Sequence, residues 1–328
     1  MNRYIDKQSS TTLKGVLMLL IIIGHNHILA PDDSIVKSVL YRFHVICFFI
    51  LPFLYKQSHE LKIRKLVDVV IRNWVPYTFV CLACWLAFSA YTRTFSFGWE
   101  HLQAYFTGHQ SLLTENFGFV FPWFLPAYCS MSILLMLSRQ YAWLFALFSI
   151  ISVYTFSLSW GEDYYCRSVI PFGLTQAFHY FIYGVLSYFL FQCFNLTKYV
   201  YVPFFAVLCI CSLYGLESFW TNVSYPIIAF FAILSIAPLL ESKLFTLLGK
   251  HSLAVYLVHV FICNVLELIL PANFFYGMIN LALTIVMSIL IAEGIQRNEH
   301  IVRLLFPRGI TDLKNILKSD KNKERYRI

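Results

Sequence analysis

The chain has 328 residues, of which 59% are apolar and only 13% are charged, and its formal net charge is +8. Soluble globular proteins average about 45–50% apolar and about 25% charged residues. The composition therefore excludes a disordered chain, a basic nucleic-acid-binding protein and an ordinary soluble enzyme, and it favours an all-α integral membrane protein.

Apolar stretches separated by short polar breaks recur along the whole chain. A helix needs about 20 apolar residues to cross a bilayer, and Trp and Tyr near the ends of such stretches are typical of membrane interfaces. We interpret the first stretch as a span rather than a cleavable signal peptide. Together the stretches predict one membrane domain, residues 1–296. We expect ten transmembrane helices, at about 13–30, 39–55, 73–91, 119–137, 142–159, 170–191, 199–215, 224–240, 252–270 and 275–296.

The basic residues predict the orientation of these helices. If the N-terminus is cytoplasmic and ten spans alternate, 21 of the 25 Lys and Arg residues fall on the cytoplasmic side. That side then carries +12 and the outer side −4. An excess of Lys and Arg in cytoplasmic loops is the general rule for membrane proteins. Both termini are therefore expected in the cytoplasm, and topology explains the positive charge without a nucleic-acid partner.

The C-terminal residues 297–328 form a predicted basic cytoplasmic tail. Because apolar and basic residues alternate there, the tail has two interpretations: an amphipathic helix on the anionic inner leaflet, or a solvated tail.

The sequence predicts no disulfide framework, because Cys166 is expected in an outer loop with no outer cysteine to pair with. Motifs for phosphate-binding loops, dinucleotide folds and zinc hydrolases are absent from the sequence. We expect no metal site.

Histidines inside the predicted spans are the first candidate functional residues, because ionisable groups at membrane depth are costly and are often functional. His25 follows Lys14 by 11 residues, which places it about 16 Å into the membrane on a helix. His44 begins the next span after a short outer loop, so His25 and His44 could face one cavity. A neutral imidazole suits a buried general base, although the commoner role for each histidine taken singly is a hydrogen-bonded contact between helices. The histidines in question are His25, His27, His44, His179 and His259.

A basic stretch leads into the third predicted span. It contains Lys62, Arg64, Lys65 and Arg72. One interpretation is a cytoplasmic anchor that follows the positive-inside rule. The other is an anion site, because Arg and Lys side chains bind phosphates.

Five stretches, in order along the chain, resemble motifs of the membrane acyltransferase 3 family. They are Leu13–His25 with its Lys-Gly and Gly-His pairs, Phe43–Phe49 with Phe-His, Arg72–Tyr77 with Pro-Tyr, Pro122–Ala127 with Trp-Phe-Leu, and Leu248–His259 with Leu-Gly, Ser-Leu and Tyr-Leu. The sequence departs from the family pattern at several positions; among them, Lys14 stands where Arg is commoner, and Ile46 stands where Pro is usual.

The resemblance implies transfer of an acyl group, usually acetyl, from cytoplasmic acyl-CoA across the membrane to a glycan hydroxyl on the outer side. By the same resemblance, His25 is the general base and His44 its partner or an acceptor contact, while His259 is interpreted as structural. We expect the protein to lie in the bilayer of a bacterial inner membrane. We expect the acceptor to be an O-antigen or a capsular polysaccharide. The residues expected to hold the phosphates of acetyl-CoA are Lys14, Arg64, Lys65 and Arg72.

Two other classes of protein share this composition. A flippase or polymerase of lipid-linked glycans, or another transporter, is the main alternative; neither a large Arg-rich outer loop nor the inverted repeats common in transporters are visible in the sequence. A membrane scaffold or sensor is the second alternative, and it would not need His25 in the middle of the membrane.

Overall fold

The computed structural model describes residues 4–56, 61–159, 170–193, 199–214, 216 and 218–316. Within these residues the protein is all α and contains no strand. The chain forms two compact units, which are Met1–Lys56 with Tyr183–Gly294, and Gln57–Ile182 with Ile295–Ile328. The predicted outer-loop Cys166 and residues 317–328 of the predicted tail lie outside the described residues.

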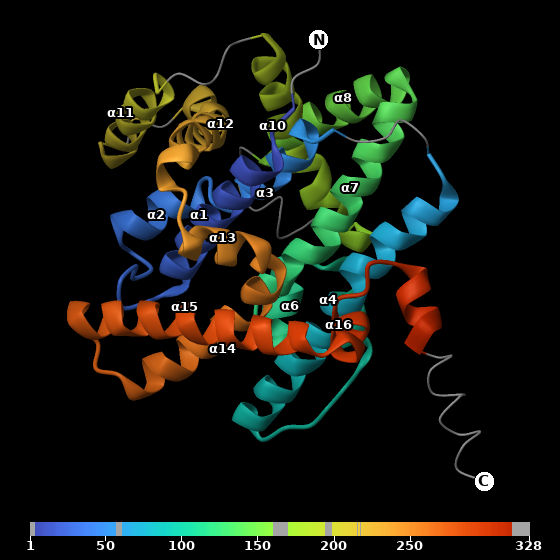
Figure 1. The fold of residues 1–328 in the computed structure, drawn as a ribbon, viewed down its shortest axis with the longest axis vertical. Coiled ribbons are helices and arrows are strands. Elements are labelled where there is room, and N and C mark those ends of the chain that lie inside the picture. The colour runs from blue at the N-terminus through green and yellow to red at the C-terminus, as the bar shows by residue number, and fades with distance from the viewer. Residues whose placement is uncertain are drawn as a thin grey trace. The chain divides into compact units, whose positions relative to one another are not determined.

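The first helix of the first unit, α1 (Lys7–His25), begins at a capping side chain and ends before Asn26 (Figure 1). Asp6 accepts a hydrogen bond from the Ser9 N–H at 2.8 Å, which satisfies a free amide at the helix start. At the other end, Asn26 accepts hydrogen bonds from two following amides, those of Ile28 and Leu29. The helix therefore stops at His25, and the expectation that it continues to residue 30 is wrong.

The second predicted span is a broken helix. It consists of α2 (Ile35–Tyr41), α3 (Ile46–Ile50) and the 3-10 turn η1 (Leu51–Leu54). Between α2 and α3, the amides of Phe43 and His44 both bond to the carbonyl of Leu40 at 3.1 Å. These two hydrogen bonds form a tight turn, and the chain changes direction between α2 and α3. His44 consequently lies in the break rather than on a continuous helix.

Helix α1 packs against a helix that was not predicted, α13 (Lys243–Lys250). A Cβ added to Gly15 would overlap the carbonyl of Phe245, and one added to Gly249 would overlap the carbonyl of Thr11. The pairs run in opposite order along the two helices, so α1 and α13 are antiparallel. Glycine at both positions lets the two backbones approach closely, as is common between membrane helices.

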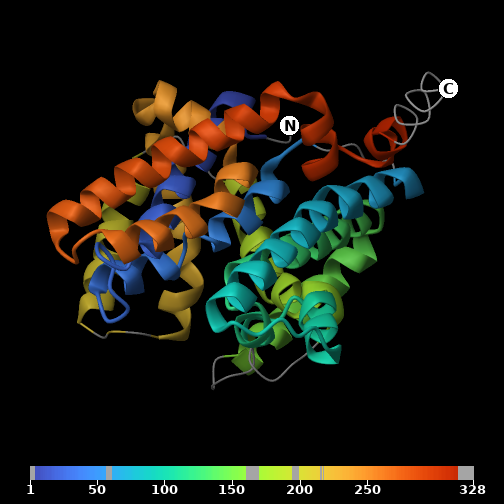
Figure 2. The ribbon, with the colours of Figure 1, turned by 90° about the horizontal axis from the view of Figure 1, so that it is seen from below.

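The first unit contains several further apolar helices. Asn280 donates to the carbonyl of Cys263 at 3.3 Å and joins two long helices that lie side by side in Figure 2. These are α14 (Ser252–Ile269) and α15 (Phe274–Arg297), and the unit also contains α11 (Tyr201–Leu213), α12 (Phe219–Ile236), η4 (Ala237–Leu240) and the second half of α10 (Leu174–Cys193).

The second unit is built on α4 (Ile63–Thr92), a 30-residue helix that continues through Pro76. The Tyr77 hydroxyl donates to the carbonyl of Tyr105 at 2.9 Å, and the two rings stack with centroids 5.0 Å apart. The unit also contains α5 (Trp99–Thr107), α6 (Gln110–Phe117), η2 (Phe121–Trp123), α7 (Phe124–Gln140), α8 (Ala142–Ser159), η3 (Pro171–Gly173), the first half of α10 and α16 (Glu299–Leu305). Helices α5 and α6 occupy the predicted outer loop 92–118, where no helix was expected.

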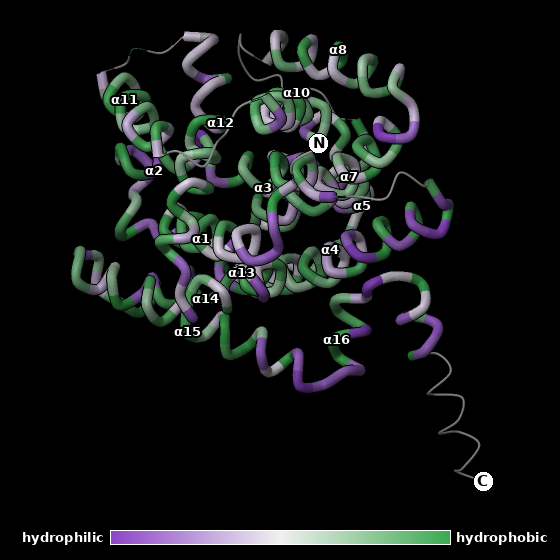
Figure 3. Tube along the Cα trace, turned by 45° about the horizontal axis from the view of Figure 1, so that its top comes forward, coloured by the Kyte–Doolittle hydropathy of each residue, from purple (hydrophilic) through white to green (hydrophobic). Residues whose placement is uncertain are grey.

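Six described segments are long and apolar enough to cross a membrane. The long helices are predominantly apolar along their length, whereas hydrophilic residues gather around α16 (Figure 3). Helices α1, α8, α10 and α11 fall at predicted spans but are not among the six, so ten spans and cytoplasmic termini stay predictions, as does the division into domain 1–296 and tail 297–328. The six segments are Ile35–Leu54, Ile63–Thr92, Phe121–Gln140, Trp220–Leu240, Ser252–Ile269 and Phe274–Arg297.

Candidate functional site

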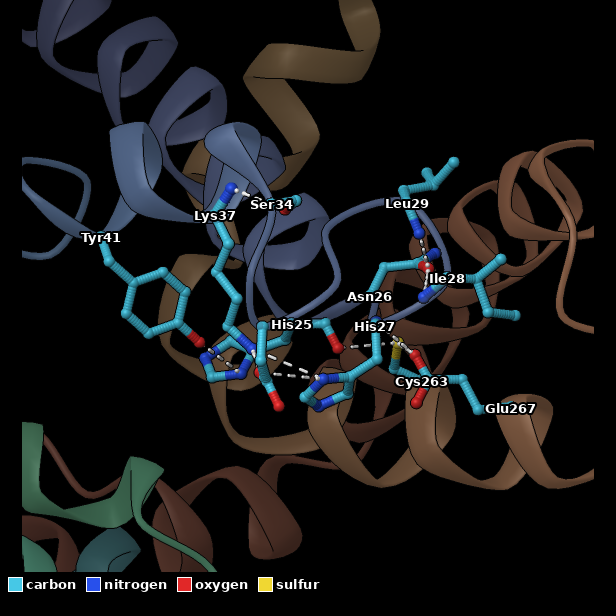
Figure 4. A network of polar contacts seen from close by, with 11 residues as sticks. His25, Asn26, His27, Ile28, Leu29, Ser34, Lys37, Tyr41, Cys263 and Glu267 are labelled. Carbon is cyan, nitrogen blue, oxygen red and sulfur yellow. Dashed lines mark hydrogen bonds and ion pairs between the residues drawn. The ribbon is translucent and has the colours of Figure 1, made fainter. Parts of the chain in front are cut away.

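His25 lies at the C-terminal end of α1 and is partly exposed. Its Nδ1 is 3.5 Å from the hydroxyl of Tyr41 (Figure 4). The ring of His259, from α14, meets the ring of His25 edge-on with centroids 5.3 Å apart. Three elements therefore converge on one partly accessible imidazole, the residue that the sequence predicts as the general base.

Tyr41 connects the two histidines that the sequence predicts to lie together. Its ring meets that of His44 edge-on at 4.9 Å and that of His25 at 6.0 Å. It also lies against Gly24, where an added Cβ would come within 3.3 Å of the ring. Tyr41 was not a candidate in the sequence analysis, because its place beside both histidines depends on the break between α2 and α3.

His44 and His259 are buried and carry defined ring protons. The Nδ1–H of His44 donates to the carbonyl of Leu40. The Nδ1–H of His259 donates to the carbonyl of Tyr256 at 2.8 Å, with that of Val255 at 3.1 Å. Because a carbonyl only accepts, the proton of each neutral ring sits on Nδ1. Both rings are thereby fixed in orientation beside Tyr41 and His25.

The backbone that follows α1 is anchored by two side chains of α14 and by a backbone carbonyl of α15. The carboxylate of Glu267 accepts the amide N–H of His27 at 2.7 Å. The thiol of Cys263 lies 3.5 Å from that carboxylate and 3.5 Å from the carbonyl of His25. Asn26 donates to the carbonyl of Gly277 at 3.0 Å. These contacts fix the end of α1, and His25 with it (Figure 4).

Two charged side chains lie beside this cluster: Lys37 on α2, and Asp32 in the loop before α2. Lys37 forms an ion pair with Asp32 and lies over the ring of Tyr41, 5.3 Å from its centroid. Its hydrogen bond to Asp32 holds the pKa of that exposed carboxyl below its usual value. His27 lies in the same loop, 3.4 Å from the Lys37 amine through its Nδ1. Because α1 ends at His25, the prediction that His27 lies within the first span's helix is wrong.

Lys14, the first predicted donor-binding residue, lies on α1 eleven residues before His25. Its amine is 5.4 Å from the centroid of the Tyr55 ring, an aromatic contact that a cation favours. Tyr55 is held in turn by a 2.7 Å hydrogen bond with Ser10. At 1.5 Å per residue, Lys14 lies about 16 Å along the helix from His25.

Three further predicted donor-binding residues lie on the first turns of α4, in the second unit. Lys65 and Arg72 are seven residues apart and share one face of the helix, with Arg64 about 100° away. Arg64 and Arg72 are exposed, and Arg64 donates to the hydroxyl of Thr311 at 2.7 Å. His179 is buried in the same unit against Phe156 and Tyr180.

The cluster around His25 is suited to proton transfer. A partly exposed imidazole whose neighbours are oriented by hydrogen bonds can accept a proton from a hydroxyl that reaches it. Among the residues that the structure describes, no group of three or more His, Cys, Asp or Glu side chains could hold a metal ion.

Comparison with known proteins gives one match. The profile of a family described as an acyltransferase domain matches residues 4–293, which is most of the chain and includes the whole cluster around His25. No curated protein matches, and no solved structure does.

Proposed function

The chain belongs to the acyltransferase 3 family, and from that premise we propose that it transfers an acetyl group from acetyl-CoA to a hydroxyl of a bacterial surface glycan. The family and the apolar helices together indicate a multi-pass membrane acyltransferase. In this proposal the donor binds at the cytoplasmic face of the inner membrane, and the acceptor, an O-antigen or capsular polysaccharide, approaches from the outer side.

His25 is the proposed general base, and its surroundings are the observation that carries the proposal. The acceptor hydroxyl attacks the thioester carbonyl while His25 takes the hydroxyl proton. The new C–O bond forms, the C–S bond breaks, and the proton passes from the imidazolium to the departing thiolate. General base catalysis contributes about 10²–10⁴-fold to such a step. Tyr41 and His259 hold the ring of His25, and His44 is a partner or an acceptor contact.

The donor has phosphates at one end and the reacting thioester at the other. Lys14, Arg64, Lys65 and Arg72 are proposed to hold the phosphates at the cytoplasmic side, because Arg and Lys bind phosphate oxygens through charge-assisted hydrogen bonds. The pantetheine arm then extends into the membrane toward His25. Lys14 lies about three helical turns before His25 on the same helix, which supports this direction.

The proposal is tested by following labelled acetyl groups. Inside-out vesicles containing the protein are given acetyl-CoA carrying labelled acetyl, and the surface glycan of the same cells is analysed for O-acetyl groups with and without the gene. We expect label to enter the glycan, and O-acetyl content to fall when the gene is removed. Unchanged O-acetyl content without the gene, with no transfer in vesicles, would contradict the proposal and favour a transporter or flippase.

A further inference from the structure

A short C-terminal segment, residues 308–312, packs on the first turns of α4 within the second unit. The amide of Ile310 donates to the Asp68 carboxylate at 2.9 Å. Arg64, one helical turn earlier, donates through Nη2 to the hydroxyl of Thr311 at 2.7 Å. The segment follows α16, which itself contacts α4. It lies beyond residues 4–293, the part of the chain that the acyltransferase family shares.

The contact is tight and is shaped by the sequence of the segment. A Cβ on Gly309 would overlap the carboxylate of Asp68, so only glycine allows this approach. The Asp312 carboxylate accepts the amide of Arg308 at 2.9 Å, and the Asp312 amide donates to the carbonyl of Gly309 at 3.2 Å. These bonds close a turn. Residues 310–316 then continue as a helix.

The charges in this contact leave Arg64 without a carboxylate partner among the described residues. Asp68 and Asp312 accept backbone amides instead of the guanidinium. The partner of Arg64 is a neutral hydroxyl, which occupies one of the five N–H donors of a guanidinium. Among the described residues, no carboxylate takes up the remaining N–H donors of Arg64. An arginine that is oriented but not neutralised suits a phosphate, because the planar guanidinium binds its oxygens in pairs.

We propose that the segment 308–312 positions Arg64 to bind a phosphate group of the acyl-CoA donor, with Thr311 and Asp68 as positioning residues. The inference rests on the proposed function, because the donor belongs to it. Thr311 fixes the plane of the guanidinium, and the contact between Asp68 and the Ile310 amide fixes Thr311. The segment therefore adds to the donor site a part that lies outside the family domain, residues 4–293.

The test compares donors with and without phosphates on the full-length protein in membrane vesicles. Thr311→Val keeps the shape of the side chain and removes the hydrogen-bond acceptor, while Thr311→Ser keeps the hydroxyl. We expect Thr311→Val to raise KM for acetyl-CoA about fivefold, the size of one modest hydrogen bond, with little change in kcat. Thr311→Ser restores the wild-type KM, and kcat/KM for acetyl-pantetheine, which has no phosphates at its end, is the same in both variants.

Three results would overturn the inference. The first is an unchanged KM for acetyl-CoA in Thr311→Val, and the second is an equal loss with acetyl-pantetheine, which would indicate a purely structural role. The third is an effect that follows the fraction of anionic lipid in the vesicles rather than the donor, which would assign Arg64 to lipid headgroups.

A binding measurement separates this inference from the proposed function. Free CoA is titrated into the purified full-length protein in the absence of an acceptor. Weaker CoA binding by Thr311→Val than by the wild type supports the inference even if no acetyl transfer is detected. Failure of the wild type to bind CoA would overturn it. Transfer with equal CoA affinity in the two proteins would overturn the inference and leave the proposed function standing.

Discussion

The ring of His25 is held by contacts from α2 and α14 rather than by its own helix. Tyr41 reaches its Nδ1, and His259 lies edge-on against the ring. The sequence predicts His25 and His44 as a pair because only a short loop separates their helices. It does not reveal Tyr41 or the place of His259, since these depend on how α2 breaks at His44 and on packing between residues more than 200 positions apart.

Removal of the Tyr41 hydroxyl tests whether it orients His25. Tyr41→Phe keeps the ring against Gly24 and His44 and deletes only the contact with Nδ1. We expect kcat to fall about 2–10-fold with KM nearly unchanged, because a single hydrogen bond contributes about 0.5–1.5 kcal/mol. Steady-state acetyl transfer in vesicles gives both constants. An unchanged kcat would mean that Tyr41 only packs against the histidine.

His251 links stability to pH. It lies between α13 and α14, is 3% exposed, and its ring nitrogens make no hydrogen bond to other described residues. Burial, and then the charge of Lys250, lower the pKa of His251, while Glu293 opposes this shift. The folded protein therefore binds this proton less readily than the unfolded chain, whose histidines titrate near pH 6.5.

The unfolding free energy should thus be constant above about pH 6.5 and should fall as the pH drops below that value, because the unfolded chain takes up the proton first. The check is the change in Tm between pH 7.5 and 5.5 for the wild type and for His251→Gln. The other histidines are present in both proteins, so their contributions to the change in Tm cancel in the comparison. We expect Tm to fall less between pH 7.5 and 5.5 in His251→Gln than in the wild type. The same change in both proteins would show that His251 does not contribute.

At the scale of elements, glycines set the distance between α1 and α13.

Helices α14 and α15 could be predicted within one or two residues, because each is one long apolar run. The end of α1 could not, since it depends on the Asn26 side chain, which bonds to the carbonyl of Gly277 from far along the chain. Helices α5 and α6 were missed because short, partly polar helices resemble loops, and α13 was missed for the same reason.

The crossing of α1 and α13 is tested with alanine. Gly249→Ala places a methyl group on the carbonyl of Thr11, and a backbone carbonyl cannot turn away as a side chain can. We expect a loss of stability of about 1–3 kcal/mol or more, as for other overpacked sites. Gly294→Ala in α15 is the matched control, because nothing lies within 4 Å of its added methyl group. Thermal unfolding of the purified protein should separate the two variants. Equal Tm values would contradict a close backbone contact.

At the scale of the whole molecule, charge predicts how the chain crosses the membrane. The structure confirms an all-helical protein in its described residues and six segments that could span. The side of the membrane on which each loop lies is predicted from the distribution of Lys and Arg. The Asp32–Lys37 loop is predicted on the outer side, and α4 begins on the cytoplasmic side.

Reporter fusions test this topology. Green fluorescent protein joined to the C-terminus should fluoresce, because it folds in the cytoplasm. A peptide tag inserted after Asp33, which is exposed in the loop before α2, should be accessible to antibody on spheroplasts with intact membranes. A dark C-terminal fusion, or a tag that is reached only after the membrane is broken, would contradict cytoplasmic termini with an even number of spans.

The central claim, that His25 is the base for acyl transfer, is tested most directly by the acetyl-transfer rate of His25→Ala beside that of His27→Ala. Both variants are reconstituted at equal abundance and saturated with acetyl-CoA. We predict that His25→Ala loses about 10²–10⁴-fold in rate while its CoA affinity stays near that of the wild type. His27→Ala, altered two residues away in the exposed loop, should retain most of the rate. Transfer by His25→Ala at a rate close to that of His27→Ala would contradict the account.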